Sequence, residues 1–382
     1  MLRMMGFPGQ YVQGPGALQQ LGGTLAKSGW QRPLVLCDAI VTNKVWPQVA
    51  AALESAGLAA RHLLFSGECT RAAIAALAAQ ARENSHDVVV GMGGGKALDT
   101  AKGMALALDV PIVICPTVAS NDAPTSRVIV LYDDAHRLEG AEFLKSNPAA
   151  VIVDTQIIAQ APARFFAAGI GDAISKKFEA AQCKATGRNN VFGTPPLHTA
   201  LLLANATYDT LVKHGAAAYR AVQDRQANEA VERVVEATVL LSGVGFEGGG
   251  LSLAHGLTRG FSAIAALAHT LHGEQVAFGA LVQLVVEARP QAEIDELVDL
   301  LCAVGLPVTL AGLGLPPSRS SEAVARIVDA TLGGQISNLV SPALSPGRLE
   351  TAIWRTDRIG AGALQCRKRS DNSTRHQVLE KT

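Results

Sequence analysis

Residues 87–102 read DVVVGMGGGKALDTAK, and this stretch decides the fold. Three consecutive valines predict a buried strand, and the residues from Lys96 to Leu108 have the periodicity of an amphipathic helix. The glycines between them lack Cβ atoms, so backbone N–H groups at the start of the helix can approach an anion closely. The loop is not a Walker motif, because Ala97 replaces the Ser or Thr that would hold magnesium, and it is not G-x-G-x-x-G. We predict that it binds the phosphates of a nucleotide; the alternative is a tight turn without a ligand.

Short β-branched runs alternate with alanine-rich helical segments from residue 33 to about residue 154. This alternation is typical of an α/β domain with a parallel, doubly wound, Rossmann-like sheet, whose ligands bind at the carboxyl ends of the strands. Asp38 follows the first strand, where a carboxylate can accept hydrogen bonds from both ribose hydroxyls and would repel the 2′-phosphate of NADP. It is otherwise an ordinary turn residue. The expected strands are 33–37, 61–65, 87–91, 111–115, 127–132 and 150–153, with helices at 46–57, 71–84 and 96–108.

After Asp154 the sequence has helical periodicity only, which predicts an all-α second domain. A last helix is expected to start at Ser345-Pro346. We therefore predict an NAD-binding α/β domain (1–160), a helical metal- and substrate-binding domain (161–360) and a basic tail (361–382) that is solvated or disordered. The other expected helices are 163–184, 195–214, 229–244, 251–267, 274–288, 293–304 and 321–331.

The composition narrows the class of partner. The chain has 382 residues, and 33 basic residues balance 33 acidic ones, so it has no electrostatic footprint for nucleic acid or an anionic membrane. The six scattered cysteines form no C-x-x-C pair, the first ten residues lack the apolar segment of a signal peptide, and no apolar run reaches the roughly 20 residues needed to span a bilayer. We expect a cytoplasmic protein with a small-molecule ligand.

One aspartate and two histidines in the helical half form a candidate metal site. Asp172 lies in GIGDA, His255 in LAHG and His272 in LHGE. This combination suits zinc or iron, and three protein ligands leave the fourth position of a tetrahedral zinc open for substrate. An alcohol bound there would lose its proton more easily and release hydride more readily. Spacing alone leaves open that the histidines are ordinary core or surface residues.

Five segments, in order, resemble the signatures of the glycerol dehydrogenases. They are GGGKALDTAK (93–102), PTVASNDAPTS (116–126), APAR to GIGDA (161–173), LSGVGFEGGG (241–250) and HTLHGEQVAFG (269–279). The resemblance covers residues 10–331 and implies a dehydroquinate synthase-like architecture, with NAD and zinc in the cleft between two domains. It assigns the metal ligands to Asp172, His255 and His272, and it implies a homo-oligomer, an octamer in this family.

The same resemblance implies roles for further residues. Asp122 would orient the hydroxyls of a small polyol, His255 would contact substrate and take part in catalysis, and His269 is a candidate for relaying a proton. The implied reaction is the reversible oxidation of glycerol to dihydroxyacetone. The implied NAD contacts are Asp38, Gly94, Gly95, Lys96, Ala97, Leu98, Asp99, Thr117, Val118, Ala119, Ser120, Ser126, Val128 and Tyr132.

Lys176 departs from the pattern of the wider superfamily. Iron-containing alcohol dehydrogenases carry a histidine four residues after the ligand aspartate, where this chain has Lys176. The three-ligand zinc class therefore fits better than a four-ligand iron site. Because a metal ion would repel a neighbouring ammonium group, we expect Lys176 to point away from the site, toward solvent.

Three alternative functions remain open. The same machinery could act on a butanediol, a propanediol or a small hydroxyketone. A related protein acting on phosphorylated substrates would need a basic pocket, and only Arg259 lies near His255 and His272 in the sequence. The third is a catalytically silent NAD-binding protein; the intact set of Asp172, His255 and His272 argues against it, whereas Lys176 and the basic tail leave it open.

Overall fold

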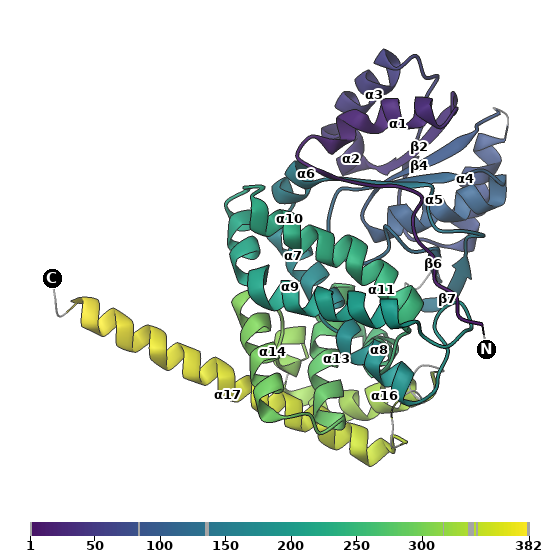
Figure 1. The fold of residues 1–382 in the computed structure, drawn as a ribbon. Helices are drawn as coiled ribbons and strands as arrows, with labels where there is room; N and C mark the ends of the chain where they lie inside the picture. Colours follow the sequence, from purple (N-terminus) through teal and green to yellow (C-terminus); the bar gives the residue numbers. More distant parts are fainter. Residues whose placement is uncertain are drawn as a thin grey trace.

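The computed structural model describes residues 2–82, 85–133, 137–315, 317–334, 340 and 343–379. Its first half is an α/β domain and the rest is helical, with the two parts stacked one above the other in Figure 1. The expected fold class is confirmed. The boundary falls between helix α6 (Thr155–Gln160) and helix α7 (Ala163–Ala173).

A six-stranded parallel sheet forms the centre of the α/β domain, with the strand order β1-β8-β5-β4-β2-β3. The chain passes from β2 to β3 on one side and then returns to β4, β5 and β8 on the other. The order therefore reverses between β2 and β4, which is the place where sheets of this type bind ligands. The strands are β1 (Tyr11–Gly14), β2 (Pro33–Asp38), β3 (Arg61–Phe65), β4 (Val88–Gly93), β5 (Ile112–Pro116) and β8 (Ala150–Asp154).

Helices cover both faces of this sheet, which explains why its central strands are continuous apolar runs. One apolar core lies under α1 and α3, and the other lies under α4 and α5 and continues into the helical domain. A separate antiparallel hairpin, β6 (Val128–Tyr132) and β7 (Leu138–Phe143), lies beside α5. The helices are α1 (Leu21–Lys27), α2 (Ala39–Lys44), α3 (Trp46–Ser55), α4 (Arg71–Ala81) and α5 (Gly95–Leu108).

The helical domain packs around α13, whose residues from Gly273 to Val286 are almost all buried. Two expected helices are interrupted: 163–184 breaks into α7 and α8, and 229–244 contains the π-helical segment η2 (Glu236–Leu241). Among the described residues no single helix is long and apolar enough to cross a membrane, although Glu229–Gly249 and Leu253–Ser262 meet that test as a pair bent by 99°. The helices are α8 (Lys176–Ala185), α9 (His198–Gln223), α10 (Glu229–Val235), α11 (Ser242–Gly249), α12 (Leu253–Ser262), α13 (His272–Val286), α14 (Gln291–Ala303), α15 (Leu310–Leu313), α16 (Ser320–Leu332) and α17 (Pro346–Leu379).

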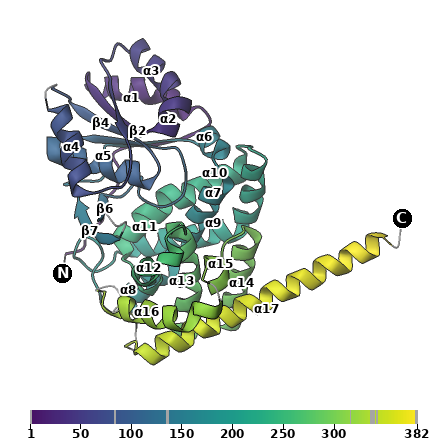
Figure 2. The same cartoon turned by 180° about the vertical axis from the view of Figure 1, so that it is seen from behind.

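The last helix, α17, begins at the expected proline and buries Leu349 and Ile353 against the helical domain. Its backbone then continues as helix to Leu379 and projects away from the body, as both views show (Figures 1 and 2). The segment 361–379, where we expected a solvated or disordered tail, is thus helical and extends from the domain. Residues 380–382 lie outside the described part.

Helices α7 and α13 approach so closely that glycine is required at their contact. A Cβ atom on Gly273 would overlap the carbonyl oxygen of Ala168, and one on Gly171 would overlap the carbonyl oxygen of Gly273. This contact places Asp172, on α7, beside His272, the first residue of α13. Close helix packing therefore determines the geometry of the candidate metal ligands.

Replacement of Gly273 by alanine is expected to force the two helices apart. We expect Gly273→Ala to lower the free energy of unfolding by about 1–3 kcal/mol, measured by urea denaturation. Gly23→Ala is the control, because Gly23 lies in α1 with open space around its Cβ position, and the change should be neutral or stabilise by about 0.5–1 kcal/mol. Equal stability of the Gly273 variant and the wild type would contradict the packing argument.

Candidate active site

The glycine-rich loop joins β4 to α5 at the point where the strand order reverses. Gly93 has a φ of 144°, a conformation that favours glycine, and Gly94 is the N-cap of α5. The loop is held from one side, because Thr117 N–H donates to the carbonyl of Gly93 (3.1 Å) and a Cβ on Gly95 would collide with the side chain of Asn121. Gly93, Gly94 and Gly95 themselves place no side chain at the start of α5, which suits the close approach of an anion to the backbone N–H groups.

Asp38 ends the neighbouring strand β2 and lies next to this loop. One of its carboxylate oxygens is 3.5 Å from the Cβ position of Gly93. The other accepts a hydrogen bond from Val41 N–H (2.9 Å) and caps helix α2. Asp38 is therefore a helix cap beside the glycine loop, and its contact with a ribose stays a prediction. Together with Thr117 to Ser120 after β5, it surrounds the loop at the carboxyl ends of three adjacent strands.

Several of the expected NAD contacts are buried beneath the loop. Both carboxylate oxygens of Asp99 are already bonded, one to Lys102 Nζ (2.9 Å) and the other to Val130 N–H (3.1 Å). Lys96 is half-exposed and pairs with Glu68 (2.6 Å). Asp99 and Lys96 therefore contact neighbouring protein groups and stabilise the structure around the glycine loop. The buried members are Ala97, Leu98, Asp99, Thr117, Ala119 and Ser126, and Val118, Ser120, Val128 and Tyr132 are partly exposed.

Lys102, which the sequence argument did not assign to the site, is a fully buried cation under this region. Besides Asp99, its ammonium donates to the carbonyls of Ala123 (2.7 Å) and Val128 (2.8 Å). It therefore ties α5 to the segment that runs from Asp122 to β6. The sequence signal was a lysine at i+3 from an aspartate inside an otherwise apolar helix.

The three candidate metal ligands converge. One ligand atom from each of Asp172, His255 and His272 lies within 4.8 Å of the other two. His255 Nε2 is 3.2 Å and His272 Nε2 is 3.8 Å from Asp172 Oδ1. Asp172 and His255 are buried, whereas 40% of the His272 side chain is exposed, so the group opens on one side. Burial nevertheless lowers the pKa of His272 to about 4, which leaves a neutral ring at neutral pH.

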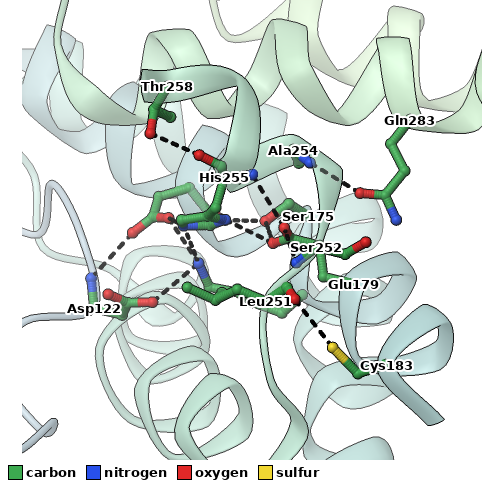
Figure 3. A network of polar contacts seen from close by, with 12 residues as sticks. Asp122, Ser175, Glu179, Cys183, Leu251, Ser252, Ala254, His255, Thr258 and Gln283 are labelled. Carbon is green, nitrogen blue, oxygen red and sulfur yellow. Dashed lines mark hydrogen bonds and ion pairs between the residues drawn. The ribbon is translucent and has the colours of Figure 1, made fainter. Parts of the chain in front are cut away.

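Glu179 on α8 fixes the orientation of His255, and it was missed in the sequence. Its Oε2 accepts a hydrogen bond from His255 Nδ1 (2.7 Å), and its Oε1 accepts from the backbone N–H of His255 (3.1 Å). This leaves His255 Nε2 facing Asp172. Burial opposes the charge on Glu179, but His255 and Lys176 outweigh it and lower the pKa of Glu179 to about 2. Figure 3 shows His255, Glu179 and Asp122 gathered around this network.

The expectation that Lys176 points toward solvent is wrong. Its side chain has no exposed surface, and its ammonium lies 2.7 Å from Asp172 Oδ1, 3.0 Å from Asp122 Oδ2 and 3.1 Å from His255 Nε2. The physical reason is the charge of the surrounding carboxylates, which hold the pKa of Lys176 above its usual value although burial opposes it. The expectation rested on repulsion between a metal ion and the Lys176 ammonium, whereas attraction by the Asp122 and Asp172 carboxylates holds the ammonium inside.

Asp122 links this group to the nucleotide loop. Its backbone N–H donates to Asp172 Oδ2 (3.2 Å), and its own Oδ2 has the Lys176 charge nearby but no aligned hydrogen-bond donor. Three residues later in the sequence, the hydroxyl of Thr125 donates to the carbonyl of Val239 (2.9 Å) in the π-helical segment η2. His269 is exposed, and its backbone carbonyl accepts a bond from Arg164 (3.1 Å); its ring is not part of the described network around Asp172.

Comparison with known proteins gives consistent results. The family model for iron-containing alcohol dehydrogenase matches residues 8–155. A glycerol dehydrogenase of Pseudomonas putida is 46% identical over 81% of this chain and 84% of its own length, and one of Escherichia coli O6:H1 is 40% identical over 95% and 99%. The chain belongs to the glycerol dehydrogenase family. The resemblance seen in the sequence is thereby confirmed.

A solved structure supports the assignment of this glycerol dehydrogenase family member at the level of the fold. The crystal structure of glycerol dehydrogenase from Schizosaccharomyces pombe superposes with a TM-score of 0.90 and 33% sequence identity, and the match covers 94% of this chain and 92% of that one. The match includes both the α/β and the helical parts, so the arrangement of these two parts is similar in the two proteins.

Loss of the Lys102 charge is expected to destabilise the domain strongly. Lys102→Met leaves the Asp99 carboxylate buried without its cation, and we expect the free energy of unfolding to fall by about 3–5 kcal/mol in urea denaturation. Lys96→Met, which removes a half-exposed lysine of the same helix, should cost less than about 1 kcal/mol. Similar losses in the two variants would contradict the role given to Lys102.

Proposed function

We propose that this protein oxidises glycerol reversibly to dihydroxyacetone, using NAD and a zinc ion held by Asp172, His255 and His272. The observation that carries the proposal is the segment 117–122. At one end Thr117 bonds to the glycine loop, and at the other end Asp122 bonds to Asp172. A nucleotide on the loop and a metal on the three ligands would therefore meet in one crevice, where hydride transfer needs both.

The donor set fits a divalent metal. Two imidazoles and one carboxylate are the ligands that zinc accepts in open, catalytic sites, and Glu179 leaves the correct nitrogen of His255 facing inward. The Oδ2 of Asp122, which forms an ion pair with Lys176 but accepts no hydrogen bond, can accept one from a substrate hydroxyl. A bound zinc would supply Lewis acidity toward that hydroxyl. Lys176 at position four after Asp172 excludes a fourth histidine ligand, which favours zinc over iron.

The chain's own residues hold and orient the reactants. Asp122 would position one hydroxyl of a vicinal diol, and the start of α5 would hold the pyrophosphate of NAD. The charge of Asp38 at the crevice would favour a free ribose over a phosphorylated one. The same geometry would accept other vicinal diols or small hydroxyketones, which differ only beyond the two oxygens. We also infer a cytoplasmic homo-oligomer, in keeping with six scattered cysteines that form no C-x-x-C pair and with the family resemblance.

The direct test is NADH formation at 340 nm with glycerol, in protein as purified, after chelation and after zinc is restored. We expect activity to be lost with the chelator and recovered with zinc. Activity unaffected by complete removal of metal would contradict the proposal. Absence of activity with glycerol in the zinc-loaded protein, together with turnover of butanediol or propanediol, would correct the substrate and leave the machinery in place.

Removal of the shared carboxylate should abolish both metal binding and turnover. We expect Asp172→Ala to lower zinc affinity and kcat/KM by at least about 100-fold, measured by metal analysis after dialysis and by the NADH assay. The control is Asp299→Ala, since that side chain is 72% exposed and lies on α14. Zinc content and turnover equal to those of the control would rule out the ligand set.

The preference for NAD should depend on the charge of Asp38 rather than on its role as a helix cap. Asp38→Asn keeps an oxygen that can accept from Val41 N–H but removes the charge, so the ratio of kcat/KM for NAD to that for NADP should fall by about tenfold. The fold should be retained, as judged by an unchanged Tm. An unchanged cofactor ratio would mean that Asp38 acts only as the cap of α2.

A further inference from the structure

We propose that the ammonium group of Lys176 and a divalent metal are alternative occupants of one position, so that the metal binds by exchange for an internal cation. This inference rests on the metal site of the proposed function but not on turnover of any substrate. It makes Lys176 a residue that sets the metal affinity of this chain.

The geometry gives the reason for the competition. The ammonium lies 2.7 Å from Asp172 Oδ1 and 3.1 Å from His255 Nε2, and these are two of the three atoms expected to bind the metal. Zinc binds oxygen and nitrogen ligands at about 2.0–2.2 Å, along the same lone pairs. Both cations cannot use these lone pairs at once, and the charges of the ammonium and the metal would repel each other strongly in a buried site.

The local charge explains why a lysine is stable there without metal. Asp122, Asp172 and Glu179 bring three carboxylates into one buried region, and burial of such charges is unfavourable unless cations compensate them. Lys176 contacts the first two and is fully buried. The ammonium thus takes over, in the metal-free protein, the compensation that a metal provides in the loaded one.

The surroundings also offer the ammonium a position to which it can move. Asp122 Oδ2, at 3.0 Å, is not among the three expected ligand atoms, and the ring centroid of Phe246 is 5.5 Å from Nζ. A carboxylate and an aromatic face can both hold a lysine ammonium. Rotation of the flexible side chain could therefore free Asp172 and His255 while the charge stays paired with Asp122.

The test measures zinc affinity in the full-length, metal-free protein by competition with a chromophoric chelator. Lys176→Met should bind zinc about tenfold more tightly than the wild type, or better, because the competing charge is removed. Lys177→Met is the matched control: its ammonium lies 3.8 Å from the ring centroid of Tyr208, outside the cluster, so zinc affinity should not change. Lys176→Gln, which keeps a hydrogen-bond donor without charge, should change affinity in the same direction if the methionine variant folds poorly.

Thermal unfolding provides a second readout that does not involve activity. The metal-free Lys176→Met protein should have a lower Tm than the wild type, and saturating zinc should raise its Tm by more than it raises that of the wild type. Equal or weaker zinc affinity in both Lys176 variants would overturn the proposal, as would absence of zinc binding in all proteins. Tighter zinc binding by the variants, with no oxidation of glycerol by the zinc-loaded wild type, would support the exchange and contradict the proposed function.

Discussion

The candidate site depends on the balance between buried carboxylates and cations. Asp122, Asp172 and Glu179 come from different segments, and their negative charges must be compensated because little water reaches them. Lys176 supplies a positive charge beside Asp122 and Asp172, and the His255 ring makes a hydrogen bond to Glu179. The consequence is geometric as well as energetic. Asp172 on α7 pairs with Lys176 on α8, and Glu179 on α8 pairs with His255 on α12. The electrostatic cluster thereby fixes the relative positions of three helices.

The α/β domain uses the same device at Lys102. A buried ammonium there joins α5 to the segment between Asp122 and β6, and it forms an ion pair with the carboxylate of Asp99. The two buried lysines thus hold adjacent residues of the same segment, one through the carbonyl of Ala123 and the other through the side chain of Asp122. This segment lies between the glycine loop and the candidate metal ligands, and in the proposed function its rigidity would help to hold substrate and nucleotide in position for hydride transfer.

The sequence was informative where local pattern and tertiary environment agree. The valines of β4 and the apolar run of β2 predicted central strands because both faces of such strands are buried. Strand β7, whose residues are mostly exposed, carries no such pattern and was missed. The sequence indicates Asp172, His255 and His272 as candidate ligands. It gives no signal for the break between α7 and α8 at Ser175. The inward direction of Lys176 depends in part on Asp122, a carboxylate from a distant segment, and therefore has no local signal either. Glu179 could have been suspected, since residues 172, 175, 176 and 179 repeat with helical spacing.

Asp122 connects the state of the cation site to the position of a substrate. Its Oδ2 faces the Lys176 ammonium, while its backbone N–H donates to Asp172 Oδ2. Any change in the cation beside Asp172 therefore alters the charge that Asp122 experiences and the hydrogen bond that fixes its backbone. Since Asn121, its neighbour in the chain, packs against Gly95 at the start of α5, a displacement of Asp122 would also reach the nucleotide loop. Under the proposed function, metal binding, polyol orientation and nucleotide binding would thus depend on one continuous network of contacts, rather than on three separate sites.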